Sequence, residues 1–483
     1  MKKEREVRVR IAPSPTGDPH VGTAYITLFN YVFAKKMGGT FILRLEDTDQ
    51  ARAKPASDKM IMESLKWLGL EWDEGPDRGG PYAPYRQSER IDLHQKHAKM
   101  LVASGKAYYC FCSTERLEEV RAKQSGQFTG YDRHCRELKS EEVSKRLSSG
   151  EGAVIRLKMP IEGVVGFDDL LRGRIEIPAE RLDDTVLLKR DGFPTYHLAN
   201  VVDDYLMKIS HVIRAEEWIS SAPKHVTLYD AFGWEKPVFC HMPLLRNPDA
   251  NKTKISKRKS PVSLNYFRRK GILPQALVNF LGLMGWSFGG DQDIFSVEQM
   301  IEKFDLTQIH LGGPVFDVGK LTWLNHQYLQ KLTKTEYIAH LRNEVFSEEA
   351  LGAIFPLLRE RVECFEQFVD KSNFFFSGSL DYTNLELIPK GRTADDIKMM
   401  LSGLLEKLDE LYTWTSKDIH EVMDKHMGEI GFKAKDYFMP VRLAVSGRKD
   451  SPPLAESMEV VGREIVRHRL REVLKHKSLN TAV

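Results

Sequence analysis

The sequence predicts an α/β domain of alternating strands and helices, followed by an all-helical C-terminal region. Two observations support this fold class. Up to about residue 106, short apolar strands alternate with helical segments, which favours a parallel sheet. Beyond about residue 325, apolar residues recur at helical spacing, for example over residues 397–411 and 463–477. A chain of 483 residues is long enough for three or more domains.

The first element is a strand, a stiff turn and a helix within residues 7–36. Apolar residues alternate with arginines over residues 7–11, and from Ala24 onward apolar residues recur every four positions. His20 and Gly22 fall at the start of that helix, where N–H groups and the helix dipole favour an anion. Gly22 leaves room for a flat base or ribose, and His20 can hold a phosphate oxygen. Taken alone, this pair is also compatible with an ordinary loop.

A second basic motif lies far downstream, at residues 254–258. Its sequence, Lys-Ile-Ser-Lys-Arg, carries three cations and follows the turn formers Asn-Pro-Asp of residues 247–249. These features predict a mobile positive loop that could close over a polyphosphate. The alternative is a solvated lysine-rich loop.

In this order, the two stretches resemble the signature motifs of class I aminoacyl-tRNA synthetases. Residues 13–24 read Pro-Ser-Pro-Thr-Gly-x-x-His-Val-Gly-Thr-Ala, which, with the Lys-Ile-Ser-Lys-Arg loop, is similar to the bacterial-type glutamyl-tRNA synthetases. The resemblance implies a Rossmann-like catalytic domain that activates L-glutamate with ATP and Mg²⁺. The product, glutamyl-adenylate, would then be transferred to the 3′-terminal adenosine of tRNA-Glu, with tRNA-Gln left open as a second acceptor.

The resemblance also implies which residues act. The catalytic residues would be His20, Lys254 and Lys257. Glutamate would be bound by Arg10, Ala12, Ser14, Glu46, Tyr196, Asn200 and Arg214. ATP would be bound by His20, Gly22, Thr23, Glu217, Leu245, Lys254, Ser256 and Lys257.

Local patterns agree with several of these assignments. Glu46 directly follows an apolar strand, at the edge where open α/β sheets bind ligands, and the resemblance assigns it to the substrate's α-amino group. Its alternative is an acidic helix start. Tyr196 and Asn200 lie four apart and would share one helix face. Arg214 follows a strand expected over residues 209–213, and a guanidinium selects a carboxylate over an amide. Its alternative is a surface pairing with a neighbouring glutamate.

A candidate metal site follows the first block. Cys110, Cys112 and Cys135 could be three ligands of tetrahedral Zn²⁺, although free buried thiols explain their spacing equally well. The resemblance implies a zinc site here. Its last ligand in some relatives is a histidine at the position of Glu137, so Glu137 is the expected fourth ligand, with Tyr131 or His134 as alternatives.

Composition narrows the class of protein. Five cysteines in 483 residues argue against a disulfide framework and favour the cytoplasm, and we expect Cys240 and Cys364 in the core. The sequence contains neither an apolar signal region nor an apolar run that suggests a membrane span. The net charge is +3, but residues 433–483 hold 11 Lys and Arg against 6 Asp and Glu. A basic C-terminal region is typical of a phosphate-contacting domain.

These observations predict five segments, in order. They are residues 1–106 (first half of the catalytic domain), 107–188 (connective, acceptor-stem insertion with the possible zinc site), 189–252 (second half of the catalytic domain), 253–325 (signature-loop and stem-contact domain) and 326–483 (helical anticodon-binding domain). Helical periodicity at the C-terminal end favours the glutamyl over the glutaminyl enzymes, which carry β-barrels there. The resemblance further implies a monomer.

The anticodon contacts follow from the resemblance alone. Arg359 and Arg361 would read the third base, and Leu454, within residues 451–454, would meet the others. A solvated face or a plain turn is the alternative.

Two other functions are compatible with parts of this sequence. A shorter paralogue that glutamylates a tRNA base would lack the helical domain, and a non-catalytic RNA-binding protein should have lost some of the site residues.

Overall fold

The computed structural model describes residues 6–15, 17, 19–49, 55–124, 130–255 and 261–480. The chain divides into two compact units. The first, called the catalytic unit below, comprises residues 1–255 and 277–320. The second, called the helical unit, comprises residues 256–276 and 321–483.

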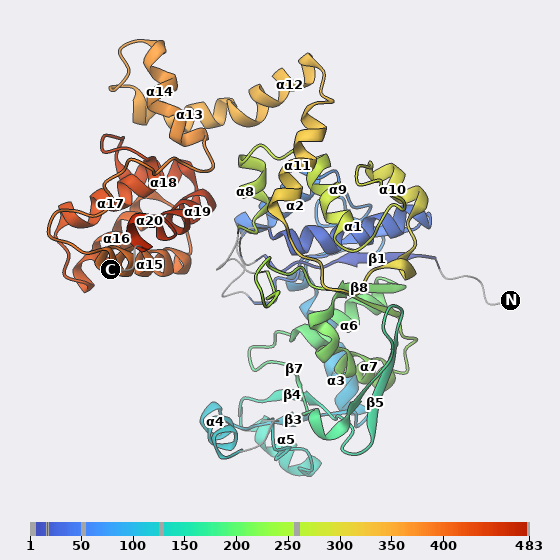
Figure 1. The fold of residues 1–483 in the computed structure, drawn as a ribbon. Coiled ribbons are helices and arrows are strands. Elements are labelled where there is room, and N and C mark those ends of the chain that lie inside the picture. The colour runs from blue at the N-terminus through green and yellow to red at the C-terminus, as the bar shows by residue number, and fades with distance from the viewer. Residues whose placement is uncertain are drawn as a thin grey trace. The chain divides into compact units, whose positions relative to one another are not determined.

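The strands of the described residues all belong to the catalytic unit (Figure 1). They form a parallel pair β1-β2, an antiparallel sheet in the order β3-β4-β7, and a mixed sheet in the order β6-β5-β9-β8. Their bounds are β1 Arg8–Ile11, β2 Thr40–Leu43, β3 Ala107–Cys110, β4 Val154–Leu157, β5 Val164–Asp169, β6 Gly173–Pro178, β7 Val186–Leu188, β8 His211–Ala215 and β9 Val238–Met242.

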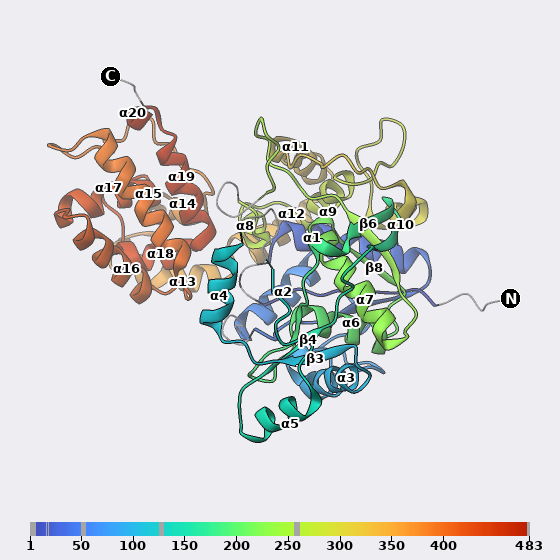
Figure 2. The same ribbon diagram turned by 90° about the horizontal axis from the view of Figure 1, so that it is seen from below.

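Nine α-helices begin within the described part of this unit. They are α1 Val21–Lys36, α2 Pro55–Trp67, α3 Ile91–Ala103, α4 Thr114–Lys123, α5 Ser140–Ser148, α6 Tyr196–Leu206, α7 Ala222–Phe232, α10 Val297–Lys303 and α11 Val318–Leu329, the last of which continues into the helical unit, while α9 Pro274–Leu283 runs from the helical unit into this one. A 3₁₀ helix, η3, spans Glu216–Ser221. Helices α4 and α5 lie beside β3 and β4, at a distance from α1 (Figures 1 and 2).

The β1-α1-β2 unit positions the site. β1 is buried along its whole length, and α1 is buried on most of its sides. The chain just before β8 joins β1, because the Arg8 N–H donates to Ser210 Oγ (2.8 Å) and the Ser210 N–H donates to the Arg8 carbonyl (2.9 Å). Strands β1 and β8 therefore lie side by side, although they are distant in sequence.

The helical unit contains no strand in its described residues. Its remaining helices are α8 Leu264–Arg269, α12 Lys334–His340, the π-helix η5 Leu341–Val345, α13 Glu348–Leu358, α14 Phe365–Phe376, α15 Ala394–Glu410, α16 Ser416–Glu429, α17 Ala434–Ser446, α18 Leu454–Val461, α19 Arg463–Leu474 and α20 Lys477–Asn480. Helices α15 to α19 pack side by side (Figures 1 and 2). At their centre the buried Arg469 donates to main-chain carbonyls of Phe374, Ser377 and Val445, so one side chain ties α14, α17 and α19 together.

The structure differs from the sequence expectations in two details. Arg214 lies within β8, whereas the sequence placed it just after the strand. Cys240 is buried as expected, but Cys364, the residue just before α14, is exposed. Among the described residues, no helix combines the length and the apolar character that a membrane crossing requires.

Candidate active site

One cavity of about 820 Å³ collects the residues that the sequence singled out. It lies in the catalytic unit, at the junction of β1, α1, α6 and β8. Among its lining residues are Arg10, Ala12, Ser14, His20, Gly22, Thr23, Glu46, Tyr196, Asn200, Arg214, Glu217, Leu245 and Lys254. Ser256 and Lys257 lie outside the described residues. Every expected glutamate or ATP residue that the structure describes therefore faces the same space.

His20 caps the first helix of the site. Its backbone is extended (φ −98°, ψ 145°), and its Nδ1 accepts a hydrogen bond from the Gly22 N–H (2.9 Å). In the neutral ring, the proton is therefore on Nε2, which becomes a donor. Glycine at position 22 leaves room for a ligand and also for the histidine ring, because a Cβ there would lie 3.0 Å from His20 Nδ1. The short motif thus sets the tautomer of the histidine as well as its position.

Beside the helix start lies a balanced group of buried charges. Arg10 donates to Asp204 through Nε (3.0 Å to Oδ1) and Nη2 (3.2 Å to Oδ2). Arg44 donates to Asp204 Oδ1 (2.7 Å) and to Glu46 Oε1 (3.3 Å). When the Asn200 amide is assigned so that its nitrogen faces Asp204, it donates to Oδ2 (3.3 Å). Two guanidinium groups thus balance two carboxylates. Burial raises the pKa of Glu46, against the opposing effect of Arg44 and Arg10.

Arg214 lies deeper and has a different environment. It is 5% exposed, and it donates to His241 Nε2 (3.0 Å), Tyr196 OH (3.1 Å), His225 Nδ1 (3.1 Å) and the Trp218 carbonyl (3.4 Å). Among the described residues, no carboxylate lies within ion-pair distance of it. Burial lowers the pKa of Arg214, since a buried cation without a counter-ion is poorly solvated. This site offers one uncompensated positive charge to a ligand.

The alternative of Arg214 as a surface ion pair does not hold. Glu216 is bound by two other arginines, Arg172 (2.7 Å) and Arg246 (2.8 Å). Glu217 pairs with Lys254, the first lysine of the basic motif. Both glutamates are thus engaged elsewhere, and the guanidinium of Arg214 is buried.

Sequence reasoning missed four residues of this site. Asp204 continues the four-residue spacing of Tyr196 and Asn200 on α6, so the pattern could have included it. Arg44 is a charged residue at the end of an apolar strand, which is a weaker signal. His225 and His241 reach Arg214 from α7 and β9, and no local pattern marks them.

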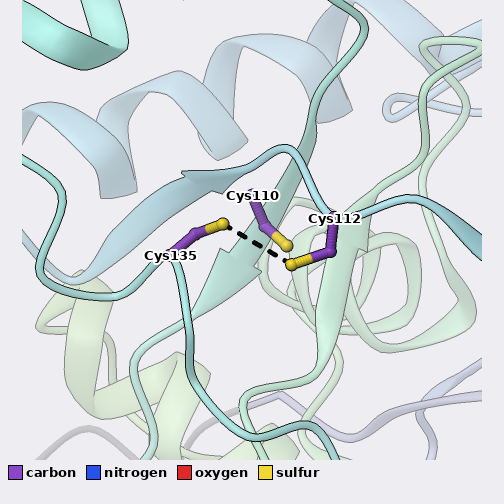
Figure 3. A group of neighbouring side chains, drawn as sticks. All are labelled: Cys110, Cys112 and Cys135. Atoms are coloured by element: carbon purple, nitrogen blue, oxygen red, sulfur yellow. Dashed lines mark hydrogen bonds between the residues drawn. The ribbon is translucent and has the colours of Figure 1, made fainter. Parts of the chain in front are cut away.

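The three cysteines come together in the connective region. Figure 3 shows the sulfurs of Cys110, Cys112 and Cys135 close together, with Cys110 at the end of β3 and Cys112 two residues beyond it. The three Sγ atoms lie within 4.8 Å of one another, and those of Cys112 and Cys135 are 3.6 Å apart. Hydrogen bonding from Cys135 is the main effect that lowers the pKa of Cys110, to about 4. Three buried soft ligands at this spacing fit a tetrahedral metal.

Of the three candidates for a fourth ligand, Tyr131 is the one whose side chain reaches the thiols. The phenol oxygen of Tyr131 lies 3.3 Å from Cys110 Sγ and 3.7 Å from Cys112 Sγ. The expected ligand Glu137 is not part of the cluster, because its side chain is 84% exposed and points toward Arg136. His134 is also exposed. The spacing after the last cysteine placed Glu137 next to the group in sequence, but the turn there directs it to solvent.

Of the expected anticodon residues, the two arginines are exposed and the leucine is buried. Arg359 and Arg361 are exposed just after α13, and Arg361 reaches Asp450 (3.2 Å). Leu454 is only 7% exposed, since it starts α18 and packs into the helical unit. The side chain of Leu454 therefore presents little surface to a base.

Comparison with known proteins shows the family to which the chain belongs. The model described as "tRNA synthetases class I (E and Q), catalytic domain" matches residues 6–323. The chain belongs to this family of class I tRNA synthetases. A second model, "Anticodon binding domain", matches residues 323–474. The synthetase is 48% identical to the glutamate–tRNA ligases of Stutzerimonas stutzeri (strain A1501) and Pseudomonas putida (strain GB-1), covering 97% of this chain and 95% of each relative.

Solved structures agree with these matches. A glutamate–tRNA ligase from Elizabethkingia meningosepticum, solved with its amino acid, is 35% identical, with a TM-score of 0.66 over 98% of this synthetase and 99% of that chain. The glutamate–tRNA synthetase of Elizabethkingia anophelis is similar, with a TM-score of 0.67 over 98% of this chain and 100% of that one. The resemblance and the fold class inferred from the sequence are confirmed. The anticodon-domain match also argues against the shorter paralogue.

Proposed function

We propose that this synthetase is a glutamate–tRNA ligase, which forms glutamyl-adenylate and transfers the glutamyl group to tRNA. The observation that carries the proposal is the buried, uncompensated guanidinium of Arg214 at the inner end of the cavity. A carboxylate that enters beside it would gain a charge-assisted bond that an amide cannot make. Tyr196 OH accepts from Arg214, so its own proton is available to the same carboxylate.

The reaction requires two group transfers. In the first, an α-carboxylate oxygen of glutamate attacks the α-phosphorus of ATP, and pyrophosphate leaves. In the second, a ribose hydroxyl of the terminal adenosine of tRNA attacks the glutamyl carbonyl, and AMP leaves. Because no covalent protein intermediate is needed, the chain supplies positioning and charge stabilisation.

Each side chain has a definite task in this scheme. Glu46, which is buried beside Arg44, accepts a hydrogen bond from the α-ammonium group of the substrate. His20 Nε2–H donates to a phosphate oxygen, and Lys254, with Lys257 of the same motif, stabilises the departing pyrophosphate. Mg²⁺, when bound with ATP, neutralises part of the charge on its phosphates. Gly22, Thr23, Glu217 and Leu245 line the part of the cavity that would take the adenosine.

The direct test is charging with radiolabelled glutamate on separate tRNA-Glu and tRNA-Gln transcripts. We expect tRNA-Glu to be labelled. Labelling of tRNA-Gln as well would keep the mechanism and identify an enzyme that accepts both tRNAs. If neither transcript is labelled in the presence of ATP and Mg²⁺, the proposed activity is wrong.

We also propose that Cys110, Cys112, Cys135 and Tyr131 bind one Zn²⁺, which would hold β3 and the loop of Cys135 together. Protein purified without chelator should contain about one equivalent of zinc. Cys135→Ser should lose most of it, since a hydroxyl is a poor replacement for a thiolate. Cys364→Ser, which changes an exposed cysteine, is the matched control and should keep the metal. Wild-type protein without stoichiometric zinc would exclude this site.

The remaining assignments rest on the same proposal. The five segments predicted from the sequence would be the working parts of a monomeric cytoplasmic enzyme. Within the helical unit, Arg359 and Arg361 are exposed and can contact an anticodon base, whereas buried Leu454 would act by packing.

A further inference from the structure

The hydrogen-bond acceptors around Arg214 are all uncharged in the part of the chain that the structure describes. Nε faces His241 Nε2 (3.0 Å), and Nη1 faces His225 Nδ1 (3.1 Å) and Tyr196 OH (3.1 Å). A guanidinium has five N–H donors and no acceptor, so each imidazole nitrogen that faces it must present a lone pair. Both imidazoles are therefore neutral in this arrangement.

His241 lies between Arg214 and the carboxylate of Asp169. The two residues are register partners on the adjacent parallel strands β8 and β9, so their side chains lie on the same face of the sheet. The other ring nitrogen of His241, Nδ1, donates to Asp169 Oδ2 (2.6 Å). Asp169 also accepts main-chain N–H groups of Leu171, Arg172 and His241, which hold it in place. Asp169 thus fixes the orientation of the His241 ring, and the ring in turn orients Arg214. Because the ring lies between them, the Asp169 carboxylate does not contact the guanidinium directly.

His225, on helix α7, is the second imidazole that accepts a hydrogen bond from Arg214. It is 1% exposed, and its Nε2 carries the ring proton and donates to His197 Nδ1 (3.1 Å). Burial lowers the pKa of His225, with the charges of Arg214 and Arg10 adding to the effect, and burial lowers the pKa of His197 to about 4. The groups that face His225 are Arg214, His197 and the Tyr196 ring, none of which is an acid near neutral pH.

We propose that His225 and His241 are specificity-determining positioning residues for the side-chain carboxylate of the substrate. As neutral acceptors they aim the guanidinium of Arg214 into the cavity, and they leave its charge for the ligand. This inference rests on the proposed glutamate–tRNA ligase function. It adds that the preference for glutamate over glutamine depends on the neutrality of the two histidines as well as on the presence of the arginine.

The physical reason is charge competition in a buried site. A carboxylate in place of either imidazole would pair with Arg214 and cancel its charge. A substrate carboxylate would then meet a neutral pair and a like charge, which is costly where water is excluded. The uncharged side chain of glutamine would lose much less binding free energy. The glutamate-to-glutamine ratio of kcat/KM should therefore fall.

The pair His225→Asn and His225→Asp tests this inference with the full-length protein. In both variants Oδ1 can take the place of Nδ1, so the two differ in charge and hardly in shape. We would measure kcat and KM for glutamate and for glutamine in the charging assay, together with KM for ATP. His225→Asn should keep the glutamate preference within about tenfold. His225→Asp should raise KM for glutamate and lower the glutamate-to-glutamine ratio of kcat/KM by about 100-fold or more, with KM for ATP unchanged.

Each outcome decides the question. An unchanged ratio in a folded His225→Asp protein would overturn the inference, and so would equal losses in both variants, which would indicate a purely structural role. If His225→Asp does not fold, as judged by thermal unfolding, the comparison of His241→Gln with His241→Glu makes the same test. Wild-type protein that charges no tRNA would instead contradict the proposed function. Calorimetric binding of glutamate to wild type and His225→Asp would then still test the charge argument.

Discussion

Replacing Arg214 with glutamine should nearly abolish the use of glutamate. The variant removes the buried cation and leaves the substrate's side-chain carboxylate without its partner. Loss of one partner of a buried ion pair costs about 3–5 kcal/mol, so kcat/KM for glutamate should fall by about 10²–10⁴-fold. The measurement is steady-state charging of tRNA over a range of glutamate concentrations.

A matched control for this variant is Arg78→Gln. Arg78 is a partly exposed arginine that pairs with Glu71 on the surface, so its loss should leave the rate near the wild-type value. Arg214→Gln protein should still bind ATP, because the adenosine part of the cavity is unchanged. An Arg214→Gln protein with wild-type affinity for glutamate would show that another group binds the carboxylate.

Replacing His20 with asparagine should slow adenylate formation by about 10²–10³-fold, the usual effect of losing one donor to developing negative charge. Asparagine is among the best helix N-caps, and its Oδ1 can accept from the Gly22 N–H as Nδ1 does now. The substitution therefore removes the Nε2 donor and keeps the cap. ATP–pyrophosphate exchange in the presence of tRNA measures the effect.

Two further variants separate catalysis from capping at this position. His20→Ala should lose the donor and, in addition, about 1 kcal/mol of stability from the cap. Ser296→Ala removes a capping side chain from α10, away from the cavity, and should lower stability without slowing adenylate formation. If His20→Asn forms adenylate at the normal rate, His20 serves as a cap and has no part in the chemistry.

The local patterns of the sequence were sufficient for the strand–helix start, the helical C-terminal region and the cavity residues at short spacing. Tyr196 and Asn200 share a face of α6 because 3.6 residues make one helical turn, and this follows from spacing alone. The wording and order of the two signature motifs were enough to indicate the family. Glu46 fell at a strand end for a similarly local reason.

The tertiary structure alone decided what surrounds these residues. Arg214 has neutral partners because β9 and α7 bring His241 and His225 beside it, and such pairings between distant segments leave no periodic signal. The same limit explains why Tyr131, and not Glu137, faces the cysteines, since the direction of each side chain depends on the turn between them.

The basic residues of the C-terminal region also show what sequence and tertiary structure each determine. The sequence determined that residues 433–483 carry a surplus of basic side chains, and this surplus suggested a surface for phosphates. In the fold, Arg467, Arg469 and Arg471 are each at least nine-tenths buried and serve the interior of the helical unit. A composition counts charges wherever they lie, whereas burial depends on which helix faces pack together. The sequence therefore determined which chemical groups the protein has, and the packing of distant segments decided which of them a substrate can reach.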